Sequence, residues 1–325
     1  MENFNQQQPR AKWPGWIVLV IAVVVAFAAA YVPFLLILAP ALWAYAGART
    51  KPVLMALPAA VFAAVMFTLD PAIVAGGLSG AALLVAILVY VLLTHRFGNA
   101  DTALVLSGVF LVGLYTAICM PGVLAGRGAF ADIQAALLGL KSFYASAATQ
   151  MPQLGEDGIK LVSSMMDAIY EAVPTNFVAV LCIFASVLGL GNLLFFRAFC
   201  RKDETISLSP MRPFRDWTMP KSMTFGLFFM LILSLILEFT EWTFAASFSA
   251  TANVLLAIPL FLQGLSVIDF FIVRSKKNVS MLRTLVYVGI GLLYQFVLVP
   301  LVLVGCFDQI FRMRERMRGV PPHAA

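Results

Sequence analysis

One pattern in the sequence has the form of a catalytic nucleophile: residues 77–80 read Gly-Leu-Ser-Gly, the glycine–any–serine–glycine order of intramembrane serine proteases. The serine of such a site needs a histidine base within hydrogen-bond reach. Of the two histidines, His95 lies about 24 Å further along the same apolar run at helical rise, and His323 stands near the end of the chain. Neither histidine can reach Ser79, so the sequence does not predict a protease.

Metal and cofactor sites are equally hard to assemble from this sequence. The cysteines form no C-x-x-C pair, and three of them lie in apolar runs, where the role of a small buried hydrophobic residue is favoured. Phosphate-loop, H-E-x-x-H and dinucleotide-binding glycine patterns are missing too. We therefore predict no metal, no cofactor and no enzymatic activity. The cysteines are Cys119, Cys182, Cys200 and Cys306.

The strongest candidates for binding chemistry are polar residues in or beside apolar segments. Glu238, Glu241 and Trp242 stand at positions i, i+3 and i+4, on one face of a helix end. Asn253 and Gln263 follow in the next apolar segment. A charge in hydrocarbon costs at least about 2.5 kcal/mol, so such groups usually face a cavity or a partner. These five residues form the predicted ligand site, which suits a cationic or heteroaromatic ligand.

Simpler roles stay open for the same residues. The two glutamates can instead lie at the membrane surface in contact with water. Amides such as Asn192 and the two amides of the predicted site can hydrogen-bond across helices without any ligand. Asp269 is expected to pair with Arg274 or Lys276 at the end of its own segment.

The elements that carry these residues are predicted to be membrane-spanning helices. Of the 325 residues, 62% are hydrophobic and 12% are charged, about half the charged fraction of soluble proteins. Apolar runs close to the roughly 20 residues that cross the hydrocarbon recur along the chain. We therefore predict an all-α, polytopic transmembrane helical bundle with about eight to ten membrane segments. The candidate segments are 16–31, 34–46, 53–69, 72–94, 102–120, 177–199, 223–237, 248–273 and 282–307.

Basic residues fall in alternate loops, as the positive-inside rule predicts for a bacterial cytoplasmic (inner) membrane. We place a cytoplasmic tail at 1–15, the bundle at 16–311, a basic cytoplasmic loop at 200–221 and a cytoplasmic tail at 312–325. Nine crossings would put the second tail outside, so either 282–307 is two short helices or another segment does not cross. The basic loops that orient the chain in the membrane account for the net charge of +6, so nucleic-acid binding is not expected.

The longest polar insert, residues 129–175, is predicted to be extracytoplasmic. Apolar residues recur in it at helical spacing and predict an amphipathic helix that ends at Pro174. Its polar face is mildly acidic, unlike that of helices that bind anionic lipid. The insert is either a connector on the bundle or the interface, or a lid over an outward-facing pocket. The apolar positions are Ile159, Val162, Met166, Ile169, Tyr170 and Val173.

Small residues recur at every fourth position in several segments, a spacing that lets two helix backbones approach closely. Most of these stripes are expected to pack within the bundle. The stripe of Ala22, Ala26 and Ala30 on the first segment is the best candidate for contact with an outside partner, because terminal helices are often peripheral.

Several loose motifs lie between residues 212 and 316. They are F-R-D-W-T-M-P at 214–220, Asn253, Q-G-L-S at 263–266 and G-C-F-D at 305–308, with Arg312 and Arg314 after them. On these motifs and on the order of its apolar segments, the chain resembles the YybS-like family of predicted bacterial membrane proteins, whose function is not established.

That family is similar in layout to the S components of energy-coupling-factor vitamin transporters, in which a helical bundle cups a small molecule. There an alanine stripe docks the energising module, and the resemblance implies that role for Ala22, Ala26 and Ala30. S components are smaller, with about six spans and no such insert. We expect a small-molecule binding or transport subunit without its own ATPase. Its partners would be the bilayer, a small-molecule ligand, and a homodimer mate or an energising membrane protein. The alternative is a non-transporting scaffold or envelope assembly factor acting through helix–helix contacts.

Overall fold

The protein is all-α, as predicted: every regular element in the described part of the chain is a helix, and this part contains no strand. Among the residues that the structure describes, six helices are long and apolar enough to cross a membrane, and three shorter apolar helices accompany them. The protein is therefore a polytopic helical membrane protein. Most of the two predicted tails and Glu241 lie outside the described residues. The computed structural model describes residues 14–95, 97–149, 155–201, 203, 206, 208, 213–219, 221–240, 242, 245–274 and 279–317.

The chain forms two compact units. Unit 1 comprises residues 1–136 and 184–209, and unit 2 comprises residues 137–183 and 210–325. The long helix α7 (Gly155–Cys200) contributes its first part to unit 2 and its last part to unit 1.

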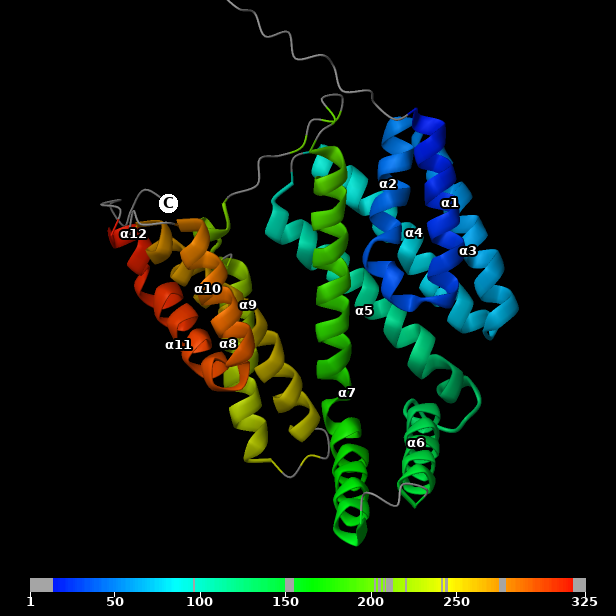
Figure 1. Cartoon of the computed structure of the whole chain (residues 1–325), viewed down its shortest axis with the longest axis vertical. Coiled ribbons are helices and arrows are strands. Elements are labelled where there is room, and N and C mark those ends of the chain that lie inside the picture. Colours follow the sequence, from blue (N-terminus) through cyan, green and yellow to red (C-terminus); the bar gives the residue numbers. More distant parts are fainter. Residues whose placement is uncertain are drawn as a thin grey trace, which may run out of the picture. The chain divides into compact units, whose positions relative to one another are not determined.

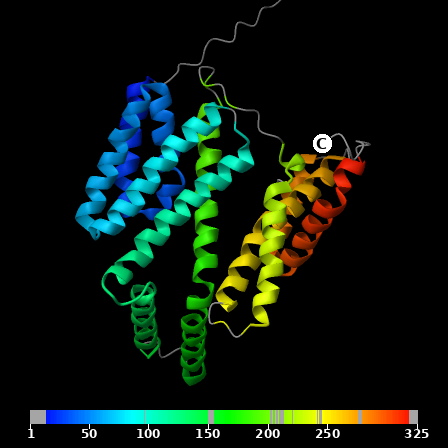
Figure 2. The ribbon, with the colours of Figure 1, turned by 180° about the vertical axis from the view of Figure 1, so that it is seen from behind.

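Unit 1 contains the first five α-helices, two short 3₁₀ helices and the end of α7 (Figure 1). Pro33 separates the first two apolar segments and begins a 3₁₀ turn, where its missing N–H costs nothing. Helices α4 and α5 lie side by side (Figure 2). The elements are α1 (Gly15–Tyr31), η1 (Pro33–Ile37), α2 (Ala39–Arg49), η2 (Pro52–Met55), α3 (Ala56–Leu69), α4 (Ala72–Thr94) and α5 (Asn99–Leu124).

The core of unit 1 is apolar and contains large side chains. Trp43 of α2 packs against Phe62 of α3 with ring centroids 5.8 Å apart, and the fully buried Phe110 and Phe196 belong to the same cluster. Ala22 and Ala26 of α1 also belong to this cluster and are 0% exposed, so both residues pack inside the unit. Ala30, the third member of the stripe, is half-buried.

Asn192 is a buried polar residue at the centre of unit 1. Its carboxamide oxygen accepts a hydrogen bond of 2.8 Å from the backbone N–H of Ala41, at the start of α2. Its amide nitrogen donates to the carbonyls of Leu36 and Leu188, each at 2.9 Å. The side chain therefore satisfies backbone groups that the break between η1 and α2 leaves without helical partners. This confirms the predicted cross-helix role of Asn192.

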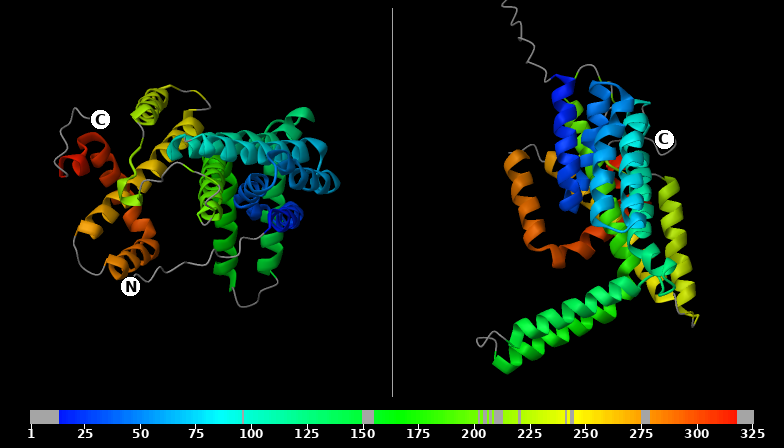
Figure 3. Two further views of the ribbon diagram at one scale, coloured as in Figure 1. Left: turned by 90° about the horizontal axis from the view of Figure 1, so that it is seen from above. Right: turned by 90° about the vertical axis from the view of Figure 1, so that its right-hand side faces the viewer.

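Unit 2 consists of the insert and the C-terminal helices. Helices α8 to α11 run alternately up and down, so the start of α8 and the end of α11 lie at the same end of the unit (Figure 1). Most of α6 and the first part of α7 lie side by side, linked by the Lys141–Asp167 ion pair (Figure 3). The elements are α6 (Ala131–Thr149), α7 (Gly155–Cys200), η4 (Phe214–Asp216), α8 (Lys221–Glu238), α9 (Ala245–Arg274), α10 (Val279–Leu292), α11 (Tyr294–Phe311) and α12 (Met313–Met317).

The structure agrees with one expectation about segment ends and contradicts another. The run 282–307 is two helices, α10 and α11, which is the first of the two alternatives for placing the C-terminal tail. The predicted helix end at Pro174 is wrong, because α7 continues through it. A proline removes one helical hydrogen bond, and a membrane helix tolerates the loss when neighbouring groups or local adjustment satisfy the freed carbonyl.

Candidate functional site

The centre of unit 2 is a close crossing of α9 and α11. A Cβ added to Gly264 would collide with the backbone carbonyl of Leu301, and a Cβ added to Gly305 would collide with that of Leu260. Gly264 thus contacts the backbone of Leu301, four residues before Gly305. In the same way, Gly305 contacts the backbone of Leu260, four residues before Gly264. Only residues without a side chain allow this approach, which brings the polar residues that flank both glycines together.

Arg314 of α12 is the most connected of these polar residues, although it is only 3% exposed. Its guanidinium donates to Asp308 Oδ2 through Nε at 3.0 Å and through Nη2 at 2.6 Å. It also donates to the carbonyls of Arg215 and Trp217, at 2.8 and 2.9 Å, and to Ser266 Oγ at 2.6 Å. Arg314 therefore joins the segment before α8 to α9 and α11.

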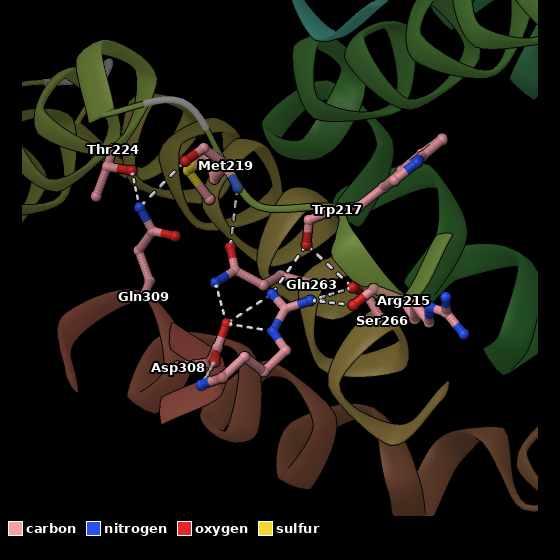
Figure 4. Close-up of polar contacts among 9 residues, drawn as sticks. Arg215, Trp217, Met219, Thr224, Gln263, Ser266, Asp308 and Gln309 are labelled. Atoms are coloured by element: carbon pink, nitrogen blue, oxygen red, sulfur yellow. Dashed lines mark hydrogen bonds and ion pairs between the residues drawn. The ribbon is translucent and has the colours of Figure 1, made fainter. Parts of the chain in front are cut away.

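Gln263 of α9 completes the network. Its amide nitrogen donates to Asp308 Oδ2 at 3.0 Å, and its carboxamide oxygen accepts from the backbone N–H of Met219 at 3.2 Å. Ser266, one turn further along α9, donates to the carbonyl of Trp217 at 3.0 Å. We call the side chains of Gln263, Ser266, Asp308 and Arg314, with the backbone of 215–219, the polar latch (Figure 4).

The chain turns sharply to bring Arg314 back over α11. Arg312 has the left-handed conformation, with φ of 48°, and its N–H bonds to the carbonyl of Asp308 at 2.8 Å. That conformation is unfavourable by about 1 kcal/mol for a residue with a side chain. Gln309 adds a second link to the start of α8, donating to Thr224 Oγ1 at 2.6 Å. The latch therefore fixes the end of α11 to the start of α8.

A second carboxylate pair lies in the same unit. Asp269 of α9 is buried and accepts two hydrogen bonds from Arg283 of α10, from Nε at 2.6 Å and from Nη2 at 2.7 Å. The expectation that Asp269 pairs with Arg274 is wrong, and Lys276 lies outside the described residues. Arg283 is better placed because it projects from the neighbouring helix, where its planar group can bind both carboxylate oxygens.

A cleft of about 360 Å³ lies beside the latch. Its polar lining comes from the segment before α8 and from Arg274 at the end of α9, and its apolar lining comes from the last turns of α9 and from α12. The lining residues are Arg215, Asp216, Phe270, Val273, Arg274 and Met317.

The structure brings only part of the predicted ligand site together. Glu238 at the end of α8 accepts a hydrogen bond of 2.7 Å from Ser249 of α9, and Asn253 follows Ser249 by one helical turn. Trp242 and Asn253 are exposed, and Glu241 is not described. Gln263 does not join them, since it lies about 21 Å along α9 from Ser249 at helical rise, in the latch.

The other chemical candidates stay apart as well. Ser79 is buried in α4, its hydroxyl has no hydrogen-bond partner within the described chain, and His95 is exposed beyond the end of that helix. No group of three or more metal-binding side chains converges among the residues that the structure describes.

A protein-family model described as "Predicted membrane protein (DUF2232)" matches residues 20–309. The chain belongs to this family. No match was found among curated proteins or among solved structures. In this DUF2232 protein, the glycines and polar residues of the sequence motifs around 214–219, 263–266 and 305–308 meet at the α9–α11 crossing and in the latch.

Sequence reasoning noted these motifs but missed what joins them. The sequence placed Arg314 in the predicted tail and among the motif residues, but did not indicate that it is the buried partner of Asp308. A signal was present: an aspartate at the end of an apolar run, followed six residues later by an arginine, can form an internal pair if the chain turns between them.

Proposed function

We propose that the protein is a small-molecule binding or transport subunit without its own ATPase and without enzymatic activity. The observation that carries the proposal is the pair of buried carboxylates, Asp269 and Asp308, each bound by an arginine of the next helix in unit 2.

Stability alone is a poor reason to keep such pairs. Desolvation of two charges can exceed their attraction, so apolar side chains of similar volume often stabilise a fold equally well. In membrane proteins, buried ionisable groups commonly mark substrate pathways or elements that change conformation. Asp308 and Arg314 connect three separate parts of unit 2, so their separation would release the start of α8 from α9 and α11.

The ligand would bind at the other end of the α8–α9 pair. Glu238 and Ser249 already contact each other there, and Asn253 lies on the same face of α9 as Ser249. A carboxylate with two neutral polar groups suits a cationic ligand. Binding at this end would alter the α8–α9 contact that the latch holds at its opposite end.

Unit 1 offers partial support for the likeness to S components, which remains a prediction. Among its described residues are five apolar segments: α1, α3 with η2, α4, α5 and the last part of the α7 span. The alanine stripe fits the implied docking role less well, because Ala22 and Ala26 are fully buried. An energising partner would therefore have to contact other residues of the unit.

Native mass spectrometry of the full chain, gently purified from its own membranes, tests the proposal. We expect a co-purifying small molecule that is lost in Glu238→Gln and retained in Glu315→Gln. The control removes a similar charge from an exposed pair, in which Arg312 and Glu315 lie 3.7 Å apart. A dimer or a protein partner without any small molecule would contradict the proposal.

A second function, that of a membrane scaffold, is favoured by a groove of about 410 Å³ along α4 and α5. Gly108 lines it together with apolar side chains, so the backbone of another membrane helix could approach closely there. Gly77 and Gly113 also border the groove, but their open sides face Thr116 and Ala81 in the contact between α4 and α5. Gly108→Leu would fill the groove, since nothing lies within 4 Å of an added Cβ there. Cross-linking to a partner should then fall, whereas Gly80→Leu, outside the groove lining, should preserve it.

A further inference from the structure

We propose that the cleft beside the latch binds the phosphodiester headgroup of an anionic phospholipid. This site is separate from the Glu238 end of unit 2 and does not depend on the proposed transport function. Its lining combines two guanidinium groups, one carboxylate and three apolar side chains.

The charges of the cleft suit a singly charged anion. Arg215 and Arg274 contribute two positive charges and Asp216 one negative charge, so the lining carries a net charge of +1. Arg215 Nε and Asp216 Oδ2 are 4.0 Å apart, at the limit of an ion pair. Arg274 has no carboxylate within ion-pair distance in the described part of the chain. The cleft thus holds guanidinium groups that a phosphate oxygen can bind.

The latch gives the cleft a fixed wall. Arg314 holds the carbonyls of Arg215 and Trp217, which anchors the segment from which the Arg215 and Asp216 side chains project. Figure 4 shows the Arg215 side chain directed away from Asp308 and the other latch residues. Because the latch uses only the backbone of Arg215, its guanidinium is available to a ligand.

The position of the cleft favours a lipid over a soluble anion. Phe270 and Val273 belong to the last turns of α9, a 30-residue helix of membrane-crossing length that ends at Arg274. A helix of this length reaches beyond the hydrocarbon, so its terminal arginine lies at the level of the headgroups. A phospholipid can place its phosphate between the arginines and its glycerol on the apolar wall. Basic pockets between membrane helices commonly bind lipids in this way.

The test uses the full chain in detergent, titrated with phosphatidylglycerol, phosphatidylcholine or inorganic phosphate and followed by native mass spectrometry. We expect phosphatidylglycerol to bind, and its affinity to fall about tenfold in Arg274→Gln and in Arg215→Gln, since one charged hydrogen bond is lost in each. The control is Arg316→Gln. Arg316 is an exposed arginine outside the cleft lining, without a carboxylate partner among the described residues, and its loss should change affinity less than about twofold.

Three results would overturn the proposal. Equal losses in Arg274→Gln and Arg316→Gln would show that binding reflects general surface charge. Equal affinity for phosphatidylcholine would show that the anionic headgroup is not recognised. Displacement of the lipid by equimolar inorganic phosphate would identify a soluble anion as the ligand. Thermal unfolding of each variant confirms that the latch is intact, since none of the three substitutions removes a latch side chain.

Discussion

The two units are stabilised in different ways. Unit 1 buries a broad apolar cluster that includes Trp43, Phe62 and Phe196, and its buried carboxylate, Asp203, lies outside the helices and pairs with Arg49 at the end of α2. Unit 2 has a small apolar cluster of Met219, Leu227 and Leu260. Four charged or amide side chains on or next to its helices are buried among its apolar residues: Gln263, Asp269, Asp308 and Arg314.

This difference affects how each unit responds to substitution. An apolar core depends on volume and tolerates changes that keep volume and pattern. A buried polar network depends on every partner, because a group left without its partner costs far more than the pair contributes. Unit 2 should therefore be sensitive at a few positions, and unit 1 should respond more evenly across its core.

The largest effect is expected for Arg314→Met. The substitution leaves Asp308 buried and without its cation, which costs about 3–5 kcal/mol in the free energy of unfolding. Chemical denaturation in detergent, followed by limited proteolysis at the start of α8, measures the loss. The double variant Arg314→Met/Asp308→Leu should recover part of the stability, since neither charge then remains buried, although the amide of Gln263 and the carbonyl of Arg215 lose these partners.

The matched control for Arg314→Met is Arg312→Met, two residues earlier and in an exposed pair with Glu315. Its effect should stay below about 1 kcal/mol. Equal losses at the two positions would mean that the latch does not stabilise unit 2, and the contrast between the two units would fail.

The next largest effect is expected at the α9–α11 crossing. Gly264→Ala and Gly305→Ala each force a methyl group against a backbone carbonyl, which neither helix can relieve by a side-chain rotation. We expect a loss of about 3 kcal/mol for each, the upper end of the overpacking range. Gly289→Ala on α10 meets open space and should be neutral or slightly stabilising. The same denaturation assay distinguishes these outcomes.

The sequence allowed prediction of what depends on local pattern. The length of the apolar runs predicted the helical class, because it depends only on neighbouring residues. The sequence did not allow prediction of contacts between residues on different elements. Asp269 bonds to Arg283 of another helix, and Arg314 contacts Arg215, 99 positions earlier. The sequence does not show whether a charge near a helix end faces water or a buried partner. Arg314 was therefore assigned to the cytoplasmic tail.

Among the polar residues of unit 1, Asn192 is the one whose substitution should reduce stability most. Asn192→Ala removes hydrogen bonds to Ala41, Leu36 and Leu188, and leaves the buried N–H of Ala41 without its partner. We expect a loss of about 2 kcal/mol. Asn192→Asp keeps the acceptor for Ala41 but buries an unpaired carboxylate beside the carbonyls of Leu36 and Leu188, so it should cost at least as much as alanine. Thermal unfolding of the full chain, followed by circular dichroism, measures the loss.

The smallest effect is expected for the ion pair of Lys141 and Asp167, which joins α6 to α7 within unit 2. These side chains are 40% and 49% exposed, whereas those of Arg314 and Asp308 are 4% and 3% exposed. Water screens the exposed pair, so Lys141→Gln should cost less than about 0.5 kcal/mol. Hydrogen exchange of the α6 and α7 amides is the sensitive measurement. A loss as large as that of Arg314→Met would mean that charge pairing itself stabilises unit 2, whereas near-neutrality would show that burial of the pair decides the effect.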